Sequence, residues 1–317
     1  MNLLAFLKNW TLPLAMLTGV VGYFAFSRLS VLAVWKPWVT EGVSLLTPAL
    51  IFAQLLLTFC KMEPRELTPK GWHVWLLLIQ VLSSGLLSLL LLLCPLGESA
   101  RICGEAAMVC LICPTATAAA VITGKLGGNA STLTTYTLLS NILAACAVPL
   151  VFPLVENHAD LTFAAAFLKI LGKVFPLLLA PFFLALLFRY FLPAIHHWLL
   201  KYHSLAFYLW AVALTLVMGQ TTRSLVQASV SWQVELGLAM VGLLACAVQF
   251  YVGKRIGSVY GDRISAGQAL GQKNTVLAIW MAVTYLNPVS SLGPGSYVVW
   301  QNLFNAWQLW KQRQQAS

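Results

Sequence analysis

The sequence has little charge: Asp, Glu, Lys and Arg together make up 9% of its 317 residues. A soluble protein carries roughly 25% of such residues, so the composition excludes an ordinary soluble domain. Acidic residues are scarcer than basic ones: the chain has nine Asp and Glu against nineteen Lys and Arg, which gives a net charge of +10. The basic residues stand singly at segment ends rather than together on one face, which argues against nucleic acid as a partner.

The sequence also has no cysteine pattern typical of a secreted, disulfide-linked fold. Its seven cysteines lie mostly inside apolar segments, which excludes an extracellular disulfide framework. The first apolar run, 10–26, follows Lys8 as the core of a signal peptide would, but no small-x-small cleavage pattern comes after it. We therefore expect this run to stay in the chain as a membrane span.

Long apolar runs are what the sequence does contain. Hydrophobic residues account for 60% of the chain, and stretches of about 20 apolar residues recur along it. Lipid cannot satisfy stray backbone N–H and C=O groups, and the alternation expected of barrel strands is absent, so the spans should be helices. The sequence predicts an all-α integral membrane protein with ten transmembrane helices, at 10–26, 42–60, 72–94, 101–124, 130–153, 164–190, 204–222, 233–253, 264–285 and 295–311.

The distribution of Lys and Arg predicts the orientation of these spans. With the N-terminus inside, twelve of the nineteen basic residues fall on the cytoplasmic side. Arg28, Lys36, Arg101 and Arg223 fall on the opposite side, and Lys169, Lys173 and Lys273 fall within spans. The loop 156–160 contains acidic residues but neither Lys nor Arg, as expected of an exterior loop. Cytoplasmic loops carry an excess of Lys and Arg, so both termini are predicted to be cytoplasmic.

Ten spans divide into two halves of five, about 1–157 and 158–317, that enter the membrane in opposite directions. Span 4 is interrupted at Pro114, and span 9 has a glycine-rich, polar interruption that includes Gly271. Broken helices in corresponding positions of inverted halves are typical of secondary transporters, whose sites lie near the bilayer midplane. We therefore expect helices 4 and 9 to be broken and to cross.

A lysine, Lys273, lies in the interruption of span 9, at the expected depth of the bilayer. An ammonium group at that depth costs at least ~2.5–3.5 kcal/mol, so it should face protein, water or an anion. Broken helices offer N–H groups at one end and C=O groups at the other, and such a centre can hold an anion beside a cation.

The sequence around both breaks resembles the bile acid:sodium symporter family. Residues 113–120 read CPTATAAA and are similar to that family's Cys-Pro-Gly-Gly-Thr-Ala-Ser-Asn, while 269–274 resemble its Glu-x-Gly-x-Gln-Asn. The tail 287–303 and Gln80 also match family positions, so the resemblance extends over essentially the whole chain. It implies one transporter unit over 1–317, with a core of spans 3–5 and 8–10 and a panel of spans 1, 2, 6 and 7.

The resemblance also implies two sodium sites behind the crossing, and this sequence departs from the family at their ligands. The equivalents of the cation-site positions are Gln80, Ala119, Ala120, Ala269 and Lys273. Sodium needs several hard oxygen ligands, which methyl groups and an ammonium do not supply. We therefore expect transport that is not coupled to sodium, with the ammonium of Lys273 in the place of one ion, close to helix carbonyl ends and Gln80.

The same lysine admits two further interpretations. It could be a counter-ion for an anionic substrate, or it could couple transport to protons, because a buried lysine can lose its proton near neutral pH. The candidate substrate-binding residues are the polar ones at the two breaks and on span 5: Thr115, Thr117, Gln272, Lys273, Asn274, Thr134, Thr137 and Asn141. No cofactor is expected. Cys103, Cys110 and Cys113 are interpreted as small packing residues rather than metal ligands.

The function predicted is secondary transport of a small or amphipathic organic anion by alternating access, in the cell membrane, with a bacterial inner membrane implied by the resemblance. One alternative is a sodium-dependent symporter with altered ion sites, and another is a membrane sensor or binding protein that does not transport. An enzyme is not expected, because no nucleophile and base pair lie at a compatible depth. Glu105, about a turn inside span 4, is interpreted as an outer-interface residue rather than a proton relay.

Overall fold

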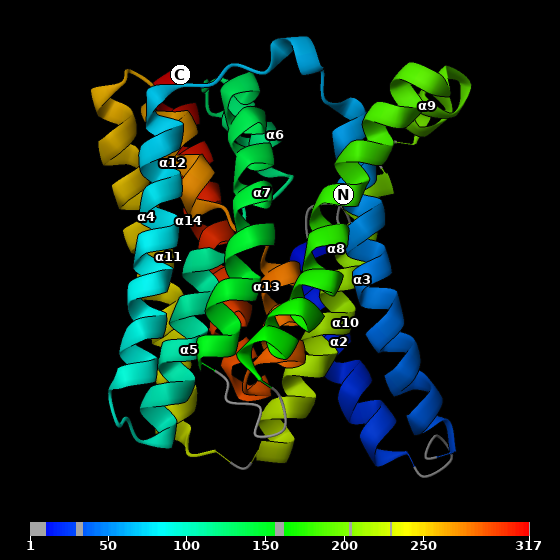
Figure 1. Ribbon diagram of the computed structural model, residues 1–317, viewed down its shortest axis with the longest axis vertical. Helices are drawn as coiled ribbons and strands as arrows, with labels where there is room; N and C mark the ends of the chain where they lie inside the picture. Colours follow the sequence, from blue (N-terminus) through cyan, green and yellow to red (C-terminus); the bar gives the residue numbers. More distant parts are fainter. Residues whose placement is uncertain (1–10, 30–33, 156–161, 203–204, 229, 317) are drawn as a thin grey trace. The chain divides into compact units, whose positions relative to one another are not determined.

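A computed structural model of the chain describes residues 11–29, 34–155, 162–202, 205–228 and 230–316, and most of these residues are in helices. The longer helices are α2 (Thr11–Arg28), α3 (Lys36–Lys61), α4 (Gly71–Leu93), α7 (Ala130–Val155), α8 (Phe163–Phe191), α10 (Leu205–Ala228), α11 (Trp232–Val259) and α14 (Leu292–Ala316). The shorter ones are α5 (Glu98–Ile112), α6 (Ala119–Lys125), α9 (Pro193–Lys201), α12 (Arg263–Gly271) and α13 (Thr275–Tyr285), with 3-10 turns η2 (Pro64–Glu66) and η3 (Pro288–Ser291) (Figure 1).

Each predicted span corresponds to a helix or, for spans 4 and 9, to a pair of shorter helices. Six helices are long and apolar enough to cross a membrane: α3, α4, α7, α8, α10 and α11. The chain is therefore a multi-pass membrane protein. Several helices continue beyond their apolar segments, because Lys, Arg and Gln at the ends favour a helix as well as a solvated surface. The N-terminal ten residues, the predicted exterior loop 156–160 and the predicted boundary between the halves lie outside the described residues.

Local sequence explains where several of these helices begin and end. The Asn274 side chain accepts a hydrogen bond from the Leu277 N–H at the start of α13, as an N-cap residue should. Asn129 does the same for the N–H groups of Ser131 and Thr132 at the start of α7. After α11 the chain turns at Gly261, where φ is +70°, a conformation that favours glycine.

The chain forms two compact units, one from residues 1–61 and 180–229 and the other from 62–179 and 230–317. In the first unit, α10 packs against α2 and α3. The close approach of α2 and α10 depends on Gly19, because a Cβ at this position would collide with the Thr215 carbonyl oxygen. His196 on α9 makes a 3.0 Å hydrogen bond to the Cys60 carbonyl oxygen, which ties α9 to the end of α3.

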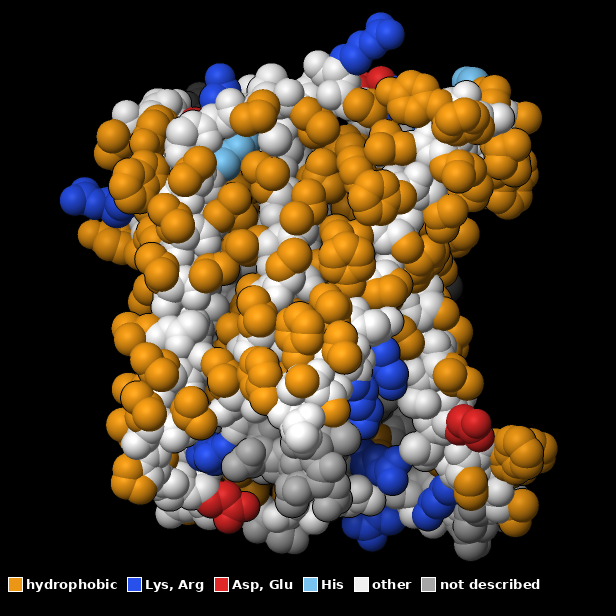
Figure 2. Space-filling view, viewed as in Figure 1, with side chains coloured by type: hydrophobic (Ala, Val, Ile, Leu, Met, Phe, Trp, Pro, Cys, Tyr) orange, Lys and Arg blue, Asp and Glu red, His pale blue; other side chains and the backbone are white. Residues whose placement is uncertain are grey.

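The second unit contains α4 to α7 and α11 to α14, and its closest packing is between α11 and its neighbours α12 and α14. A Cβ added at Gly253 would lie 2.5 Å from the Ala266 carbonyl oxygen, and one at Gly242 would lie 2.6 Å from that of Gly293. Small residues of this kind let membrane helices approach closely. On the face drawn in Figure 2, hydrophobic side chains cover most of the surface and charged side chains lie mainly toward its two ends, as expected of a protein surrounded by lipid.

Candidate functional site

Two helix interruptions of the second unit lie directly against each other. The first separates α5 from α6, at 113–118, and the second separates α12 from α13, at 272–274 (Figure 1). Thr115 and Lys273 form an antiparallel bridge between them. Ala116 N–H donates to the Gln272 carbonyl oxygen at 2.9 Å, and Asn274 N–H donates to that of Pro114 at 2.9 Å. Each break therefore supplies partners for backbone groups that the other leaves open.

Thr115 links this crossing to α12 and α7. Its hydroxyl donates to the Ala269 carbonyl oxygen at 2.6 Å, near the end of α12. Its N–H donates to the Ser140 hydroxyl at 3.1 Å, on α7. Thr115 is fully buried, so it serves as a joint between three parts of the unit.

The carboxyl end of α5 has open carbonyl groups, because Pro114 has no N–H to donate to the Cys110 oxygen and the helix stops at Ile112. Side chains from three other segments supply donors to consecutive carbonyls. The Nε2 of Gln249 on α11 donates to the Cys110 oxygen at 3.2 Å. The Nε2 of Gln80 on α4 donates to the oxygens of Ile112 and Cys113, at 2.7 and 3.3 Å.

Lys273 completes this set of donors. Its Nζ donates to the Leu111 carbonyl oxygen at 3.2 Å, and its backbone N–H donates to Gln301 Oε1 at 3.0 Å. The residue is 1% exposed. A cation is favoured at the carboxyl end of a helix, where the dipole is negative. The ammonium group of Lys273 therefore lies at a helix carbonyl end and acts on the same end as Gln80.

The alanines at the predicted cation-site positions lie in an apolar environment. Ala119 and Ala269 are fully buried in a cluster with Trp72, Leu76 and Tyr136, and Ala120 packs against the same cluster. Methyl groups in such a cluster offer no oxygen to an ion. Among the described residues there is also no group of three or more His, Cys, Asp or Glu that could hold a metal.

Most predicted polar residues of span 5 hydrogen-bond within their own helix, α7. Thr134 and Thr137 donate to the carbonyl oxygens of Ala130 and Leu133, at 2.8 and 3.0 Å, and Asn141 Nδ2 donates to that of Thr137 at 2.7 Å. The Oδ1 of Asn141 is buried with no protein hydrogen-bond partner among the described residues.

The other predicted residues of the breaks differ in burial. Gln272 is 4% exposed and Asn274 is 6% exposed, and the Gln272 side chain donates to that of Gln268. Thr117 is half-buried in the first break. The structure thus brings Thr115, Gln272, Lys273 and Asn274 together at the crossing, whereas the hydroxyls of Thr134 and Thr137 donate to backbone carbonyl oxygens of α7.

Several residues that contact the crossing were not predicted as site residues. Ser140 meets Thr115, Gln301 meets Lys273, and Gln249 meets the end of α5. Tyr297 on α14 donates to the Gly271 carbonyl oxygen at 2.8 Å, at the end of α12. The only signal in the sequence is that each is a polar residue within an apolar span, where polar groups commonly join helices.

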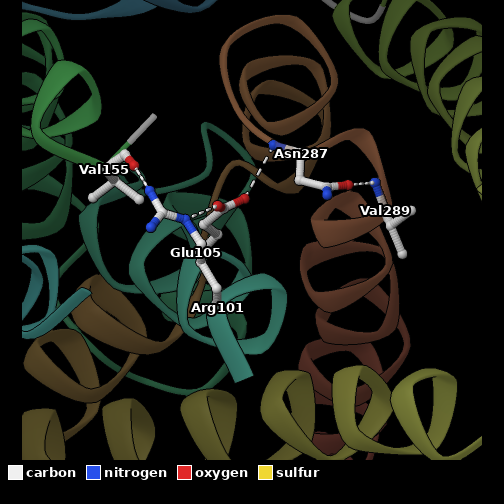
Figure 3. Close-up of polar contacts among 5 residues, drawn as sticks. All are labelled: Arg101, Glu105, Val155, Asn287 and Val289. Carbon is white, nitrogen blue, oxygen red and sulfur yellow. Dashed lines mark hydrogen bonds and ion pairs between the residues drawn. The ribbon is translucent and has the colours of Figure 1, made fainter. Parts of the chain in front are cut away.

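Glu105 is a further residue whose role only the structure reveals. It is 1% exposed, and its Oε2 accepts a hydrogen bond from the Asn287 N–H at 3.0 Å, after the end of α13. Its Oε1 lies 3.7 Å from Arg101 Nε, and Arg101 also donates to the Val155 carbonyl oxygen at the end of α7 (Figure 3). Glu105 and Arg101 therefore link α5 to the ends of α13 and α7.

Two discontinuous helices that meet within a bundle of apolar helices are a feature of secondary transporters built around broken spans. Residues 74–229 match the profile of the Sodium Bile acid symporter family, and the chain belongs to this family. The match includes the first interruption but not the second. Comparison of the chain with curated proteins gave no match.

Proposed function

We propose that the protein is a secondary transporter of a small or amphipathic organic anion that works by alternating access without sodium. In this proposal ten spans cross the membrane as two inverted halves, about 1–157 and 158–317. Spans 3–5 and 8–10 act as the core, and spans 1, 2, 6 and 7 as the panel. The family supports membrane transport, and the paired interruptions support a binding centre built from helix ends.

The observation that carries the absence of sodium coupling is the contact between Lys273 Nζ and the Leu111 carbonyl oxygen. This ammonium supplies a positive charge to open helix carbonyls, which is what a bound cation would otherwise do. Ala119 and Ala269 supply no side-chain oxygen at the neighbouring positions. Lys273 therefore acts as a tethered cation, present in every state of the cycle, and no ion gradient is needed to fill its place.

The proposed substrate site uses the polar groups at the breaks and on α7. Thr117 and Thr134 are half-buried, so part of each residue is open to a substrate, whereas Thr115 and Lys273 hold the crossing in place. Asn141 Oδ1 is an open acceptor and would bind a hydroxyl or other donor of the substrate. An organic anion fits this set, because the N–H ends of α6 and α13 favour negative charge.

Transport into proteoliposomes tests this function. The probes are a labelled bile acid and a panel of small organic carboxylates, selected first by the rise in unfolding temperature that a bound ligand causes. We expect uptake with equal initial rates in sodium, potassium and choline buffers. Uptake that strictly requires a sodium gradient would overturn the sodium-independent mechanism. Ligand binding with no flux would instead identify a membrane sensor.

A substitution at Lys273 tests the tethered cation separately. Lys273→Gln restores the residue type of the resembled family at this position and removes the charge, so we expect slower uptake or a changed dependence of uptake on pH. The control is Lys125→Gln, an exposed lysine at the end of α6 in the same unit. Unchanged uptake by Lys273→Gln at every pH tested would leave the lysine without a role in transport.

A further inference from the structure

A shallow cavity of about 570 Å³, broadly open at the surface, lies in the first unit, between the start of α3 and the end of α10. The candidate transport site does not use it. Its walls are formed by Lys36, Pro37, Thr40, Glu41, Ser44 and Arg223. Two basic residues from helices far apart in the sequence thus meet one carboxylate and two hydroxyl groups.

The guanidinium group of Arg223 is fixed at the wall of this cavity. Its Nη1 donates to the Thr40 hydroxyl at 3.1 Å, and its Nε donates to Gln227 Oε1 at 3.3 Å. Arginine has five N–H donors, so three stay available for a ligand. Planar guanidinium groups bind phosphate and carboxylate oxygens with two parallel hydrogen bonds.

The charge of the cavity favours a negative ligand. Lys36 and Arg223 are both exposed, and within the part of the chain that the structure describes neither forms an ion pair. Glu41 is the one acidic residue among the lining residues, so the positive charges are in excess. The Ser44 hydroxyl is bound to the Glu41 carbonyl oxygen at 2.7 Å, which leaves the two cations as the main ligand-binding groups.

Large apolar side chains next to the cavity indicate what the negative ligand is attached to. Trp35 is 60% exposed, Trp38 is 71% exposed and Leu45 is 68% exposed. Figure 2 shows hydrophobic, basic and acidic side chains next to one another at this end of α3. Tryptophan is enriched where membrane and water meet, and long basic side chains reach from there toward the headgroups. The ligand should therefore combine a phosphate with an acyl tail.

We propose that this cavity binds the phosphodiester headgroup of a membrane phospholipid. Lys36 and Arg223 bind the phosphate oxygens, and Glu41 accepts hydrogen bonds from the hydroxyl or ammonium group of the headgroup. The acyl chains lie along the apolar surface that follows Trp38 on α3. This inference does not depend on the transported substrate, because all its residues lie in the first unit and outside the proposed transport site.

Native mass spectrometry of the full chain in detergent tests the proposal, with phosphatidylglycerol as the probe. Each basic residue near a membrane surface contributes enough attraction to change affinity about fivefold. We therefore expect Arg223→Gln and Lys36→Gln each to raise the apparent dissociation constant for the lipid about fivefold. Arg223→Lys should retain part of the binding because it keeps the charge. Lys201→Gln, on α9 of the same unit, is the matched control and should bind as wild type does.

A second set of measurements separates the lipid from a free anion. Inorganic phosphate and glycerol phosphate, which have no acyl chains, should compete with phosphatidylglycerol only at much higher concentration. Equal competition would overturn the lipid proposal in favour of a soluble anion site. Lipid binding unchanged in both Arg223→Gln and Lys36→Gln would overturn the site itself. If Arg223→Gln does not fold, as judged by circular dichroism, Lys36→Gln carries the test.

Discussion

Lys273 is the residue on which the proposed mechanism depends. An isolated ammonium group within a membrane has a high free energy. In this protein the Nζ of Lys273 donates a hydrogen bond to the Leu111 carbonyl oxygen at the end of α5. The sequence predicted that this lysine would lie near helix carbonyl ends and Gln80, because the breaks and the substitutions are visible in the motifs. The sequence did not indicate that Gln249 on α11 also donates to the end of α5, because no local pattern in α11 or in α5 relates the two helices.

Removing the charge while keeping the length of the side chain should weaken the fold. In Lys273→Met the Leu111 oxygen loses its donor in a buried place, so we expect a loss of about 1–3 kcal/mol in the free energy of unfolding. Thermal unfolding in detergent, followed by intrinsic fluorescence, measures the effect. Lys125→Gln is the control, because that side chain is exposed. An unfolding temperature equal to that of wild type would show that the contact contributes nothing to stability.

Glu105 carries a prediction of the same kind. Its carboxylate accepts the Asn287 N–H and lies beside Arg101. Glu105→Ala leaves this buried N–H without its acceptor and should cost about 1–3 kcal/mol of unfolding free energy. Glu105→Gln keeps an oxygen in reach and should cost less, and Glu98→Gln, exposed at the start of α5, should have little effect. Equal stability of the Ala variant and wild type would contradict the linking role of Glu105.

At the scale of the helix, the sequence located both interruptions because proline and glycine break a helix through local stereochemistry. The first break lies at 113–118, around the predicted Pro114, and the second at 272–274, immediately after Gly271. What holds the breaks together is not local. Thr115 and Lys273 pair across 157 intervening residues, and their bridge follows from the packing of α11, α12 and α5.

Close helix packing leads to a prediction at Gly242 on α11. A Cβ there would lie 2.6 Å from the Gly293 carbonyl oxygen and 2.9 Å from the Tyr297 N on α14. Because backbone atoms cannot move aside as side chains do, α11 and α14 must separate in the Gly242→Ala variant. We expect this to lower the free energy of unfolding by about 1–3 kcal/mol. Gly85→Ala on α4 has open space at its Cβ and should be neutral or stabilising. A Gly242→Ala variant as stable as Gly85→Ala would contradict the packing.

For the whole molecule, the inverted arrangement of ten spans stays a prediction. Six helices are clearly long and apolar enough to span a membrane. The remaining predicted spans are the first, the last and the two that are broken, each of which is shorter, interrupted or more polar. That these four spans also cross the membrane is part of the proposal of two inverted halves, because the halves must contain equal numbers of spans.

Membrane orientation tests this arrangement. The predicted even number of spans and the distribution of Lys and Arg predict that both termini are in the cytoplasm. A reporter enzyme active only in the periplasm, fused after residue 317, should therefore be inactive in a bacterial host, while a fluorescent cytoplasmic reporter should be active. The loop 156–160 should label with a membrane-impermeant reagent after introduction of a single cysteine into a cysteine-free variant. A periplasmic C-terminus would contradict the predicted orientation, and an unlabelled loop would contradict its predicted exterior position.

The sequence by itself determined that the chain is a helical membrane protein with two broken segments, because hydropathy and helix breaking depend on residues a few positions apart. The resemblance added the family and drew attention to Ala119, Ala269 and Lys273. Only the tertiary structure decided which groups meet: Ser140 with Thr115, Gln301 with Lys273, and Glu105 with Asn287. These contacts join segments far apart in the chain, and their geometry is set by how closely the helices pack, which no local pattern encodes.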